Sequence, residues 1–264
     1  MTRPIRAELR RLLTTPLWKW GPFAALASGG LLTAACVLIG PERFDPPMPG
    51  IGTDAGVRLV LSMIGLTVLV PALFGALAVT AEYRHGTIAY TFLFEPRRHR
   101  VLAAKLAAYA LAGTAYGLLT ALSAAAALYG AAAVKGVDVG AAPGTVAGLL
   151  AGLGAAMAAY TVIGVGLGAL LRNQTATLLV LGAYLYMVEH LLALVPGVNH
   201  AYAFLPGGAT AALTGSSLMT AAAAETTGSA AALLPPVLGG AVLLAYALAA
   251  AAAAVTAPML RDVT

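Results

Sequence analysis

Charged side chains gather in one segment of this chain, residues 82–105, which lies between two long apolar runs. The segment carries five of the fifteen lysine and arginine residues, together with Glu82 and Glu95. Carboxylates and guanidinium groups in a loop offer ion pairs and hydrogen bonds to another protein. A loop this elaborate between two apolar runs of membrane length needs a reason. We therefore predict that residues 82–105 dock a soluble partner.

Sequence patterns of nucleotide hydrolysis, metal binding and acyl transfer do not occur in the chain. The dipeptide Gly-Lys is absent, so there is no G-x-x-x-x-G-K-[ST] phosphate loop. H-E-x-x-H and G-x-S-x-G are also absent, and one cysteine is too few for a cysteine metal cluster. The four histidines are scattered over three segments. The sequence thus predicts no catalytic residue, no metal site and no cofactor in this chain, which we do not expect to be an enzyme.

Composition places the chain in a membrane. It is 60% hydrophobic and 9% charged, whereas a soluble domain is about 25% charged. Alanine is abundant and favours helices over strands. We predict an all-α membrane protein, a single transmembrane domain over residues 1–264, with a third and a fourth helix longer than a bilayer needs. The predicted spans are 17–40, 57–81, 101–134, 143–171, 175–195 and 233–257.

The distribution of basic residues predicts the orientation of these spans. With the N-terminus in the cytoplasm, twelve of the fifteen lysine and arginine residues lie on the cytoplasmic side and three lie outside. Both termini are therefore expected to be cytoplasmic, in a multi-pass protein of the inner or plasma membrane. The net charge of +5 then reflects anionic membrane lipids as partners, and we expect no binding to nucleic acid.

The N-terminal segment, residues 1–16, has an apolar stripe at helical spacing and a basic face. This pattern predicts a short helix lying in the inner membrane interface, followed by Trp18 and Trp20 as aromatic anchors. The alternative is an ordinary basic flank that only sets the topology. The stripe consists of Ile5, Leu9, Leu12, Leu13 and Pro16, and the basic face of Arg3, Arg6 and Arg10.

Two connections on the outer side differ in character. Residues 41–56 are rich in proline and glycine and predict an irregular loop. Residues 196–232 contain alanine-rich pieces between glycine and proline breaks, which predicts short helices that dip into the outer leaflet. Such backbone is tolerated at that depth only where protein or water covers it.

Ionisable residues within the spans are scarce, and Glu189 and His190 are the clear cases. Glu189 either lines a polar translocation path or pairs with a neighbouring helix, or it lies near the outer headgroups and holds the helix in position. His190 points about 100° away along the helix, and we expect it to be an interfacial anchor. Glycines repeat every fourth residue in the third and fourth spans, which predicts close packing within the bundle.

The charged segment has a readable local structure. Gly86 permits the backbone to break, and Thr87 is a candidate N-cap for a short helix over residues 88–94. That helix is aromatic and apolar, so we expect it to pack on the bundle or on a partner. Glu95 precedes Pro96, and the residue before a proline is disfavoured in a helix.

The end of this segment is basic. Arg97, Arg98 and Arg100 return the chain to the membrane. Lys105 lies at the start of the third predicted span, where we expect its amine to snorkel toward the headgroups.

The pattern of the segment resembles the loop that follows the second span in permease subunits of type-2 ATP-binding cassette (ABC) exporters. The N-terminal amphipathic segment, the six spans and the long loop before the last span are also similar to that family. The motif covers about 24 residues, and Ala104 stands where the family often has glycine. The residues that carry the resemblance are Glu82, Arg84, Gly86, Thr87, Pro96, Arg97, Arg98 and Lys105.

The resemblance implies a function and partners. Permeases of this family work as dimers, with a second copy or a paralogue, and a separate ATPase subunit binds ATP and Mg²⁺ and powers export. The short helix of the loop is the family's coupling helix, which fits a cleft in the ATPase. The implied coupling loop, residues 82–100, together with the lysine that follows it, comprises Glu82, Tyr83, Arg84, His85, Gly86, Thr87, Phe92, Pro96, Arg97, Arg98 and Lys105.

Other functions stay open at this point. An ion-coupled secondary transporter would show internal repeats and charges at mid-membrane, and the chain has no convincing repeat. A non-catalytic membrane assembly protein would account for the spans, but not for the elaborate loop. The substrate class also stays open among drug, antibiotic, peptide and lipid.

Overall fold

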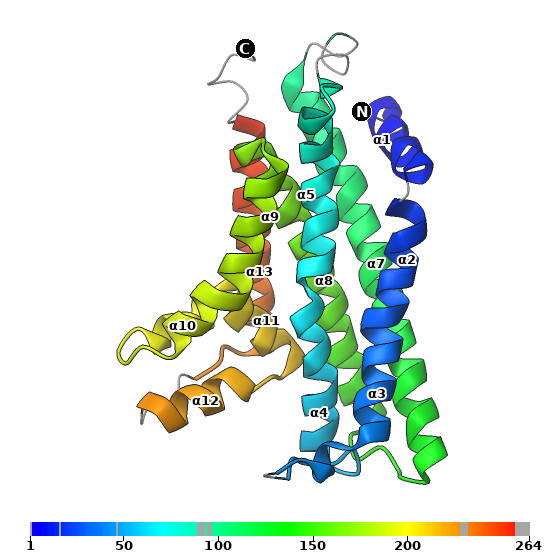
Figure 1. Ribbon diagram of the computed structural model, residues 1–264, viewed down its shortest axis with the longest axis vertical. Helices are drawn as coiled ribbons and strands as arrows, with labels where there is room; N and C mark the ends of the chain where they lie inside the picture. Colours follow the sequence, from blue (N-terminus) through cyan, green and yellow to red (C-terminus); the bar gives the residue numbers. More distant parts are fainter. Residues whose placement is uncertain are drawn as a thin grey trace.

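The computed structural model of the chain describes residues 2–15, 17–45, 47–88, 93, 97–227 and 232–256. Within these residues the chain is helical and contains no strand. Six helical segments of this part are long and apolar enough to cross a membrane, and they form one bundle (Figure 1). The all-α class and the six predicted spans are therefore confirmed, and the chain is a multi-pass membrane protein.

The first span contains a π-helical turn where it meets the third span. A Cβ on Gly29 would overlap the backbone oxygen of Thr120, so only glycine allows the two helices to approach this closely. Beside it, the hydroxyl oxygens of Ser28 and Tyr116 lie 3.2 Å apart in a hydrogen bond. The span runs through α2 (Leu17–Leu26), the π-turn η1 (Ala27–Leu31) and α3 (Leu32–Ile39).

The second span begins earlier than the predicted residue 57. Thr53 caps the helix that starts at Asp54, because its hydroxyl accepts a hydrogen bond from the Gly56 amide at 3.1 Å. The irregular loop predicted for residues 41–56 is therefore shorter, and it holds one 3-10 turn, Pro41–Arg43. The span consists of α4 (Asp54–Met63), the 3-10 turn η3 (Ile64–Thr67) and α5 (Leu69–Arg84).

The fourth span is the central helix of the bundle, because α5, α7 and α13 all pack on it. A Cβ on Gly164 would overlap the Ala72 carbonyl of α5, and one on Gly117 would overlap Gly154. The predicted close packing of glycines within the bundle is thus found. The helices concerned are α7 (Arg98–Lys135), α8 (Pro143–Leu171) and α13 (Pro236–Thr256), the last being the sixth span.

Helix α7 is longer than a bilayer requires, as the sequence predicts. Its 38 residues correspond to about 57 Å at 1.5 Å per residue, against about 30 Å of hydrocarbon. Its far end is held by Lys135, which donates to the Val37 carbonyl at 3.0 Å and to Glu42 at 2.8 Å. The excess length at this end therefore contacts protein.

The fifth span is interrupted by a second π-turn, beyond which short helices follow. The helices predicted between residues 196 and 232 are present, and one of them, α11, packs on α8 and α13 (Figure 1). Coverage by protein thus accompanies the irregular backbone there. The elements are α9 (Gln174–Ala183), η4 (Tyr184–Val188), α10 (Glu189–Ala193), η5 (Asn199–Phe204), α11 (Pro206–Thr214) and α12 (Leu218–Thr227).

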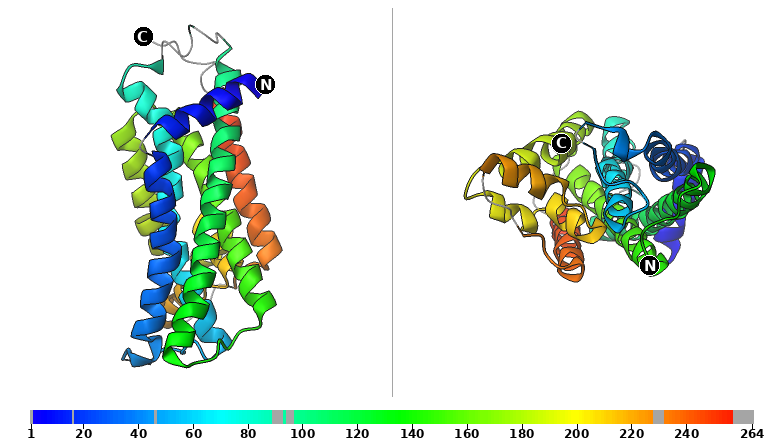
Figure 2. Two further views of the ribbon diagram at one scale, coloured as in Figure 1. Left: turned by 90° about the vertical axis from the view of Figure 1, so that its right-hand side faces the viewer. Right: turned by 90° about the horizontal axis from the view of Figure 1, so that it is seen from below.

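One end of the bundle carries helix α1 (Thr2–Thr14), the α5–α7 connection and the last turn of α13 (Figure 1). We call it the α1 end. The N-terminal segment is helical, as predicted, and α1 lies across α7 at an angle to the bundle axis (Figure 2). Its apolar residues Ile5, Leu9 and Leu12 pack against a buried apolar cluster whose members come from α5, α7, α8 and α13.

Candidate functional site

Helix α5 ends in a glycine cap at the α1 end. Gly86 has a φ of 65°, in the left-handed region. The Thr87 amide donates to the Glu82 carbonyl at 3.0 Å, and the Gly86 amide donates to the Tyr83 carbonyl at 3.3 Å. This pair of bonds is the Schellman motif, which stops a helix and turns the chain away. The backbone break predicted at Gly86 is therefore found, and it fixes where the loop leaves the bundle.

Four ionisable side chains meet beneath this cap, and we call them the ionic cluster: Glu8, Arg11, Glu82 and Lys105. One carboxylate oxygen of Glu82, Oε1, accepts hydrogen bonds from both the Lys105 amine and the Arg11 guanidinium. The Lys105 amine also donates to Glu8 Oε2 at 2.9 Å. The cluster joins α1 to α5 and α7, three helices that are distant in the sequence.

The cluster is buried to different depths. The Glu82 and Lys105 side chains are 1% and 2% exposed, whereas Arg11 is 39% exposed. Two acids and two bases balance in charge, which offsets the cost of removing each ion from water. Glu82 Oε2 is buried and has no hydrogen-bond partner among the described residues. Among the four residues, Glu82 therefore depends most on its partners, since the two cations at Oε1 alone stabilise its buried negative charge.

The prediction that Lys105 snorkels to the headgroups is wrong. Its amine turns inward and lies among Glu8, Glu82 and the Ala78 carbonyl, which it contacts at 3.4 Å. An inward lysine needs a charged partner, and Glu8 stands 97 residues away in the sequence. The spacing of residues near Lys105 does not reveal Glu8 as its partner. A lysine that points outward to the headgroups needs no such partner, so the sequence favoured that orientation.

The other predicted loop residues are divided between surface and contact positions. Arg84 is exposed and donates to the Gln174 side chain at 3.2 Å. Tyr83 is half-buried and lies under the Arg172 guanidinium, 5.9 Å from the ring centre. These two contacts link the end of α5 to the α8–α9 connection.

Three further loop residues face outward at the α1 end. His85, Thr87 and Arg97 are exposed. Phe92, Pro96 and the Arg98 side chain lie outside the described residues, as does most of the predicted helix over residues 88–94. The described part of the loop thus has an outward set of side chains above an inward ionic cluster.

Glu189 forms a second polar site, away from the α1 end. Its side chain is buried, and Oε2 accepts a hydrogen bond from the Gly207 amide at 2.6 Å. Gly207 lies in the first turn of α11, where an anion is favoured by the free amides and the helix dipole. Glu189 thus contacts a neighbouring helix and is closed off from the surface, which agrees with the first alternative drawn from the sequence, a polar path or a partner helix, rather than with a place near the outer headgroups.

Hydroxyl groups surround this carboxylate. Tyr160 and Thr210 are buried beside it and share a hydrogen bond of 3.2 Å. Tyr202, in the turn η5, is buried, and this burial together with the Glu189 carboxylate raises the pKa of its phenol. Glu189 Oε1 has no partner at hydrogen-bond distance in the described structure, although the Tyr184 hydroxyl interacts with the Glu189 carboxylate. The neighbouring His190 is half-buried, and its Nδ1 likewise lacks a partner there.

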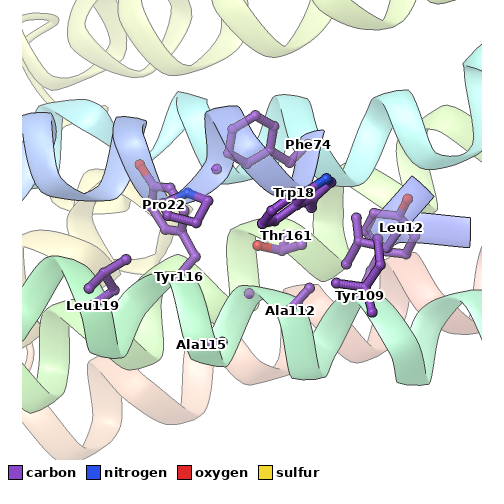
Figure 3. Close-up of a pocket in the computed structure, with 13 residues that line it drawn as sticks. Leu12, Trp18, Pro22, Phe74, Tyr109, Ala112, Ala115, Tyr116, Leu119 and Thr161 are labelled. Carbon is purple, nitrogen blue, oxygen red and sulfur yellow. The ribbon is translucent and has the colours of Figure 1, made fainter. Parts of the chain in front are cut away.

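An apolar cavity of about 330 Å³ begins beside the ionic cluster, at Tyr109, and its lining is drawn in Figure 3. Residues of α1, α2, α5, α7 and α8 form its walls, with Leu12 and Tyr109 near the cluster and Thr161 on the central helix. Sequence reasoning missed this cavity, because it arises between five helices whose apolar residues are indistinguishable in the sequence from residues that contact lipid.

No group of three or more histidine, cysteine, aspartate or glutamate side chains that could hold a metal ion occurs in the described part of the chain. Comparisons with protein-family models, curated proteins and solved structures found no match to this chain.

Proposed function

We propose that this chain is the permease subunit of an ABC exporter and that a separate ATPase docks on its 82–100 loop. The supporting observation is the arrangement at the α1 end, where exposed loop side chains stand directly on a buried ionic cluster. Glu82 and Lys105 lie at the two bases of the loop, in α5 and α7, and the Lys105 amine bonds the Glu82 carboxylate. A displacement of the docked loop would therefore move both helices together.

The proposed mechanism is rigid-body movement of packed helices. α5 and α7 both pack on the central helix α8, so their displacement reaches the middle of the bundle. α1 would move with them, because Glu8 and Arg11 join the same cluster. ATP and Mg²⁺ would act on the partner subunit, and two permease copies or paralogues would enclose the substrate path. None of the residues described here needs a catalytic role.

The proposed function also implies how the bundle is oriented in the membrane. The α1 end would face the cytoplasm of a cell whose inner or plasma membrane holds the protein, with both termini on that side. α1, amphipathic and attached across the end of the bundle, would lie in the membrane interface.

The experiment is affinity purification from the native membrane in mild detergent, followed by mass spectrometry and an ATPase assay. A charge reversal at the loop surface, Arg97→Glu, should reduce the co-purified ATPase about tenfold, equivalent to 1.4 kcal/mol of binding free energy. Arg43→Glu makes the same charge change at an exposed site on the opposite end of the bundle and should leave the ATPase bound. A chain that purifies alone, or equal losses in both variants, would refute the docking role.

Glu189 favours a second candidate function, an ion-coupled secondary transporter. A buried carboxylate with one unpartnered oxygen among tyrosine hydroxyls is a feature of proton and cation pathways. The two functions differ in their energy source. Transport in vesicles that requires ATP and a second subunit supports the exporter, whereas transport driven by an ion gradient with this chain alone, and lost in Glu189→Gln, supports the carrier.

A further inference from the structure

The apolar cavity at the α1 end has few polar side-chain groups in its lining: the hydroxyls of Tyr109, Tyr116 and Thr161 and the indole of Trp18. Thr161 Oγ1 donates to the Met157 carbonyl at 2.9 Å, and the Tyr116 hydroxyl is engaged by Ser28. The remaining walls are mostly alkyl and aromatic side chains, among them Leu12, Phe74 and Leu119 (Figure 3). A cavity of this kind favours an apolar occupant, because ordered water needs two or more polar partners.

The size of the cavity further limits which molecules can occupy it. At about 330 Å³ it is at the lower end of the range for small-molecule sites, roughly 300–1,000 Å³. Its long walls follow helices α2 and α7, from Leu12 and Tyr109 at one end to Leu119 at the other (Figure 3). One slender alkyl chain running along these helices fits this shape.

The outer rim of the cavity is next to positive charge. Leu13 lines the cavity and is itself exposed. Arg6 and Arg10 precede it by seven and three residues, a spacing that places Leu13 at the edge of the apolar stripe, next to both arginines of the basic face. Both arginines are exposed and form no ion pair within the described residues. Lys19, the next cation after Arg11, lies 5.9 Å from the centre of the Trp18 ring, which also lines the cavity.

We propose that this cavity is a binding site for an anionic membrane lipid, with one acyl chain between α2 and α7 and the headgroup over Arg6 and Arg10. The apolar lining favours an acyl chain, and the exposed arginines favour a negatively charged headgroup. The inference does not depend on the proposed transport function, since it concerns a site within one copy of the chain. The bound lipid would fill the space between α1 and the bundle.

Tryptophan fluorescence tests the proposal directly. The chain has two tryptophans, and Trp20→Phe leaves Trp18, in the cavity wall, as the single fluorophore. The protein is reconstituted with phosphatidylglycerol or phosphatidylcholine whose acyl chains carry bromine, which quenches nearby tryptophan. We expect half-maximal quenching at a mole fraction of the anionic lipid at least about fivefold lower, since each interfacial cation near anionic lipid contributes about that factor.

Matched variants separate the cavity from the general lipid surface. Ala112→Phe fills the cavity and should remove the preference for brominated phosphatidylglycerol. Ala126→Phe makes the same change on the same helix at an exposed position outside the cavity and should leave the preference intact. Should Ala112→Phe fail to insert, Gly21→Leu occupies the same space, because a Cβ there meets only the Phe74 ring at 3.8 Å.

The headgroup is tested by Arg6→Gln combined with Arg10→Gln, which changes two exposed side chains and leaves the apolar lining unaltered. The mole fraction of phosphatidylglycerol at half-maximal quenching should then rise to that of phosphatidylcholine. The extent of quenching at saturating lipid should stay the same. Equal quenching by both lipids in the unaltered cavity would overturn the proposal. So would a preference that persists in both Ala112→Phe and the double arginine variant, because the lipid would then lie elsewhere around Trp18.

Discussion

Replacing Lys105 by methionine removes the one cation of the ionic cluster that contacts both carboxylates. Lys105 is 2% exposed, and its amine is bonded to Glu8 and Glu82. Breaking a buried ion pair from one side costs about 3–5 kcal/mol of the free energy of unfolding, because the partner charge is left uncompensated. Arg11 still contacts Glu82, so we expect a loss at the lower end, about 3 kcal/mol. Methionine is one heavy atom shorter than lysine and matches its unbranched stem, so little packing is lost.

The same helix supplies a control. Lys135→Met makes the identical change at the far end of α7, where Lys135 pairs with Glu42, with side chains 17% and 46% exposed, and also donates to the Val37 carbonyl. An exposed pair of this kind contributes at most about 1 kcal/mol. Equilibrium unfolding in mixed micelles, monitored by tryptophan fluorescence, measures both variants. A difference between them below about 0.5 kcal/mol would refute the reasoning.

A second substitution tests whether charge balance is the cause. In Lys105→Met the cluster holds two acids and one base, and adding Glu82→Gln restores one of each. The double variant should therefore be more stable than Lys105→Met alone, although it has lost one more native group. Additive destabilisation would show that shape and hydrogen bonding, rather than net charge, hold the cluster together.

Two glycines give further predictions. Gly86→Ala should lower the free energy of unfolding by about 1–2 kcal/mol, because the left-handed conformation costs a residue with a Cβ that much. No neighbour lies within 4 Å of this Cβ to add a clash. Gly130, a helical glycine that also has no neighbour within 4 Å, is the control, and an equal loss in Gly130→Ala would contradict the prediction. Gly207→Ala should destabilise the protein more than Glu189→Gln, because its Cβ would overlap the Glu189 carboxylate. Thermal unfolding of the purified variants checks both orders, and a reversed order for Gly207 and Glu189 would mean that α11 moves aside freely.

Periodicity and hydropathy were sufficient to predict the spans. The predicted fourth span, residues 143–171, matches α8, because Pro143 at its first turn and the break after Leu171 are local signals. Trp18–Ile39 and Asp54–Arg84 differ from their predictions by a few residues, where a cap or a frayed end decides the bound. The two π-turns were not predicted, since no local signal separates them from ordinary helix.

The ionic cluster could not be predicted for a different reason. Its members stand at positions 8, 11, 82 and 105, and each reads locally as a topology signal or a helix flank. Charges near span ends are ordinarily solvated, so burial follows only from how α1 crosses the end of the bundle. The same holds for Glu189, whose partner is a backbone amide that any residue other than proline would supply.

The cluster divides into two neutral halves. α1 carries Glu8 and Arg11, and the bundle carries Glu82 and Lys105, so each half holds one acid and one base. If α1 leaves the bundle, the Glu82–Lys105 pair stays compensated, and Glu8 and Arg11 become solvated. Separation therefore strands no net charge in the low-dielectric interior, whereas any single neutralising substitution does. In a cluster of this composition, a single neutralising substitution therefore costs more free energy than the separation of α1 from the bundle. This property suits a helix that must be held in place and still be able to move.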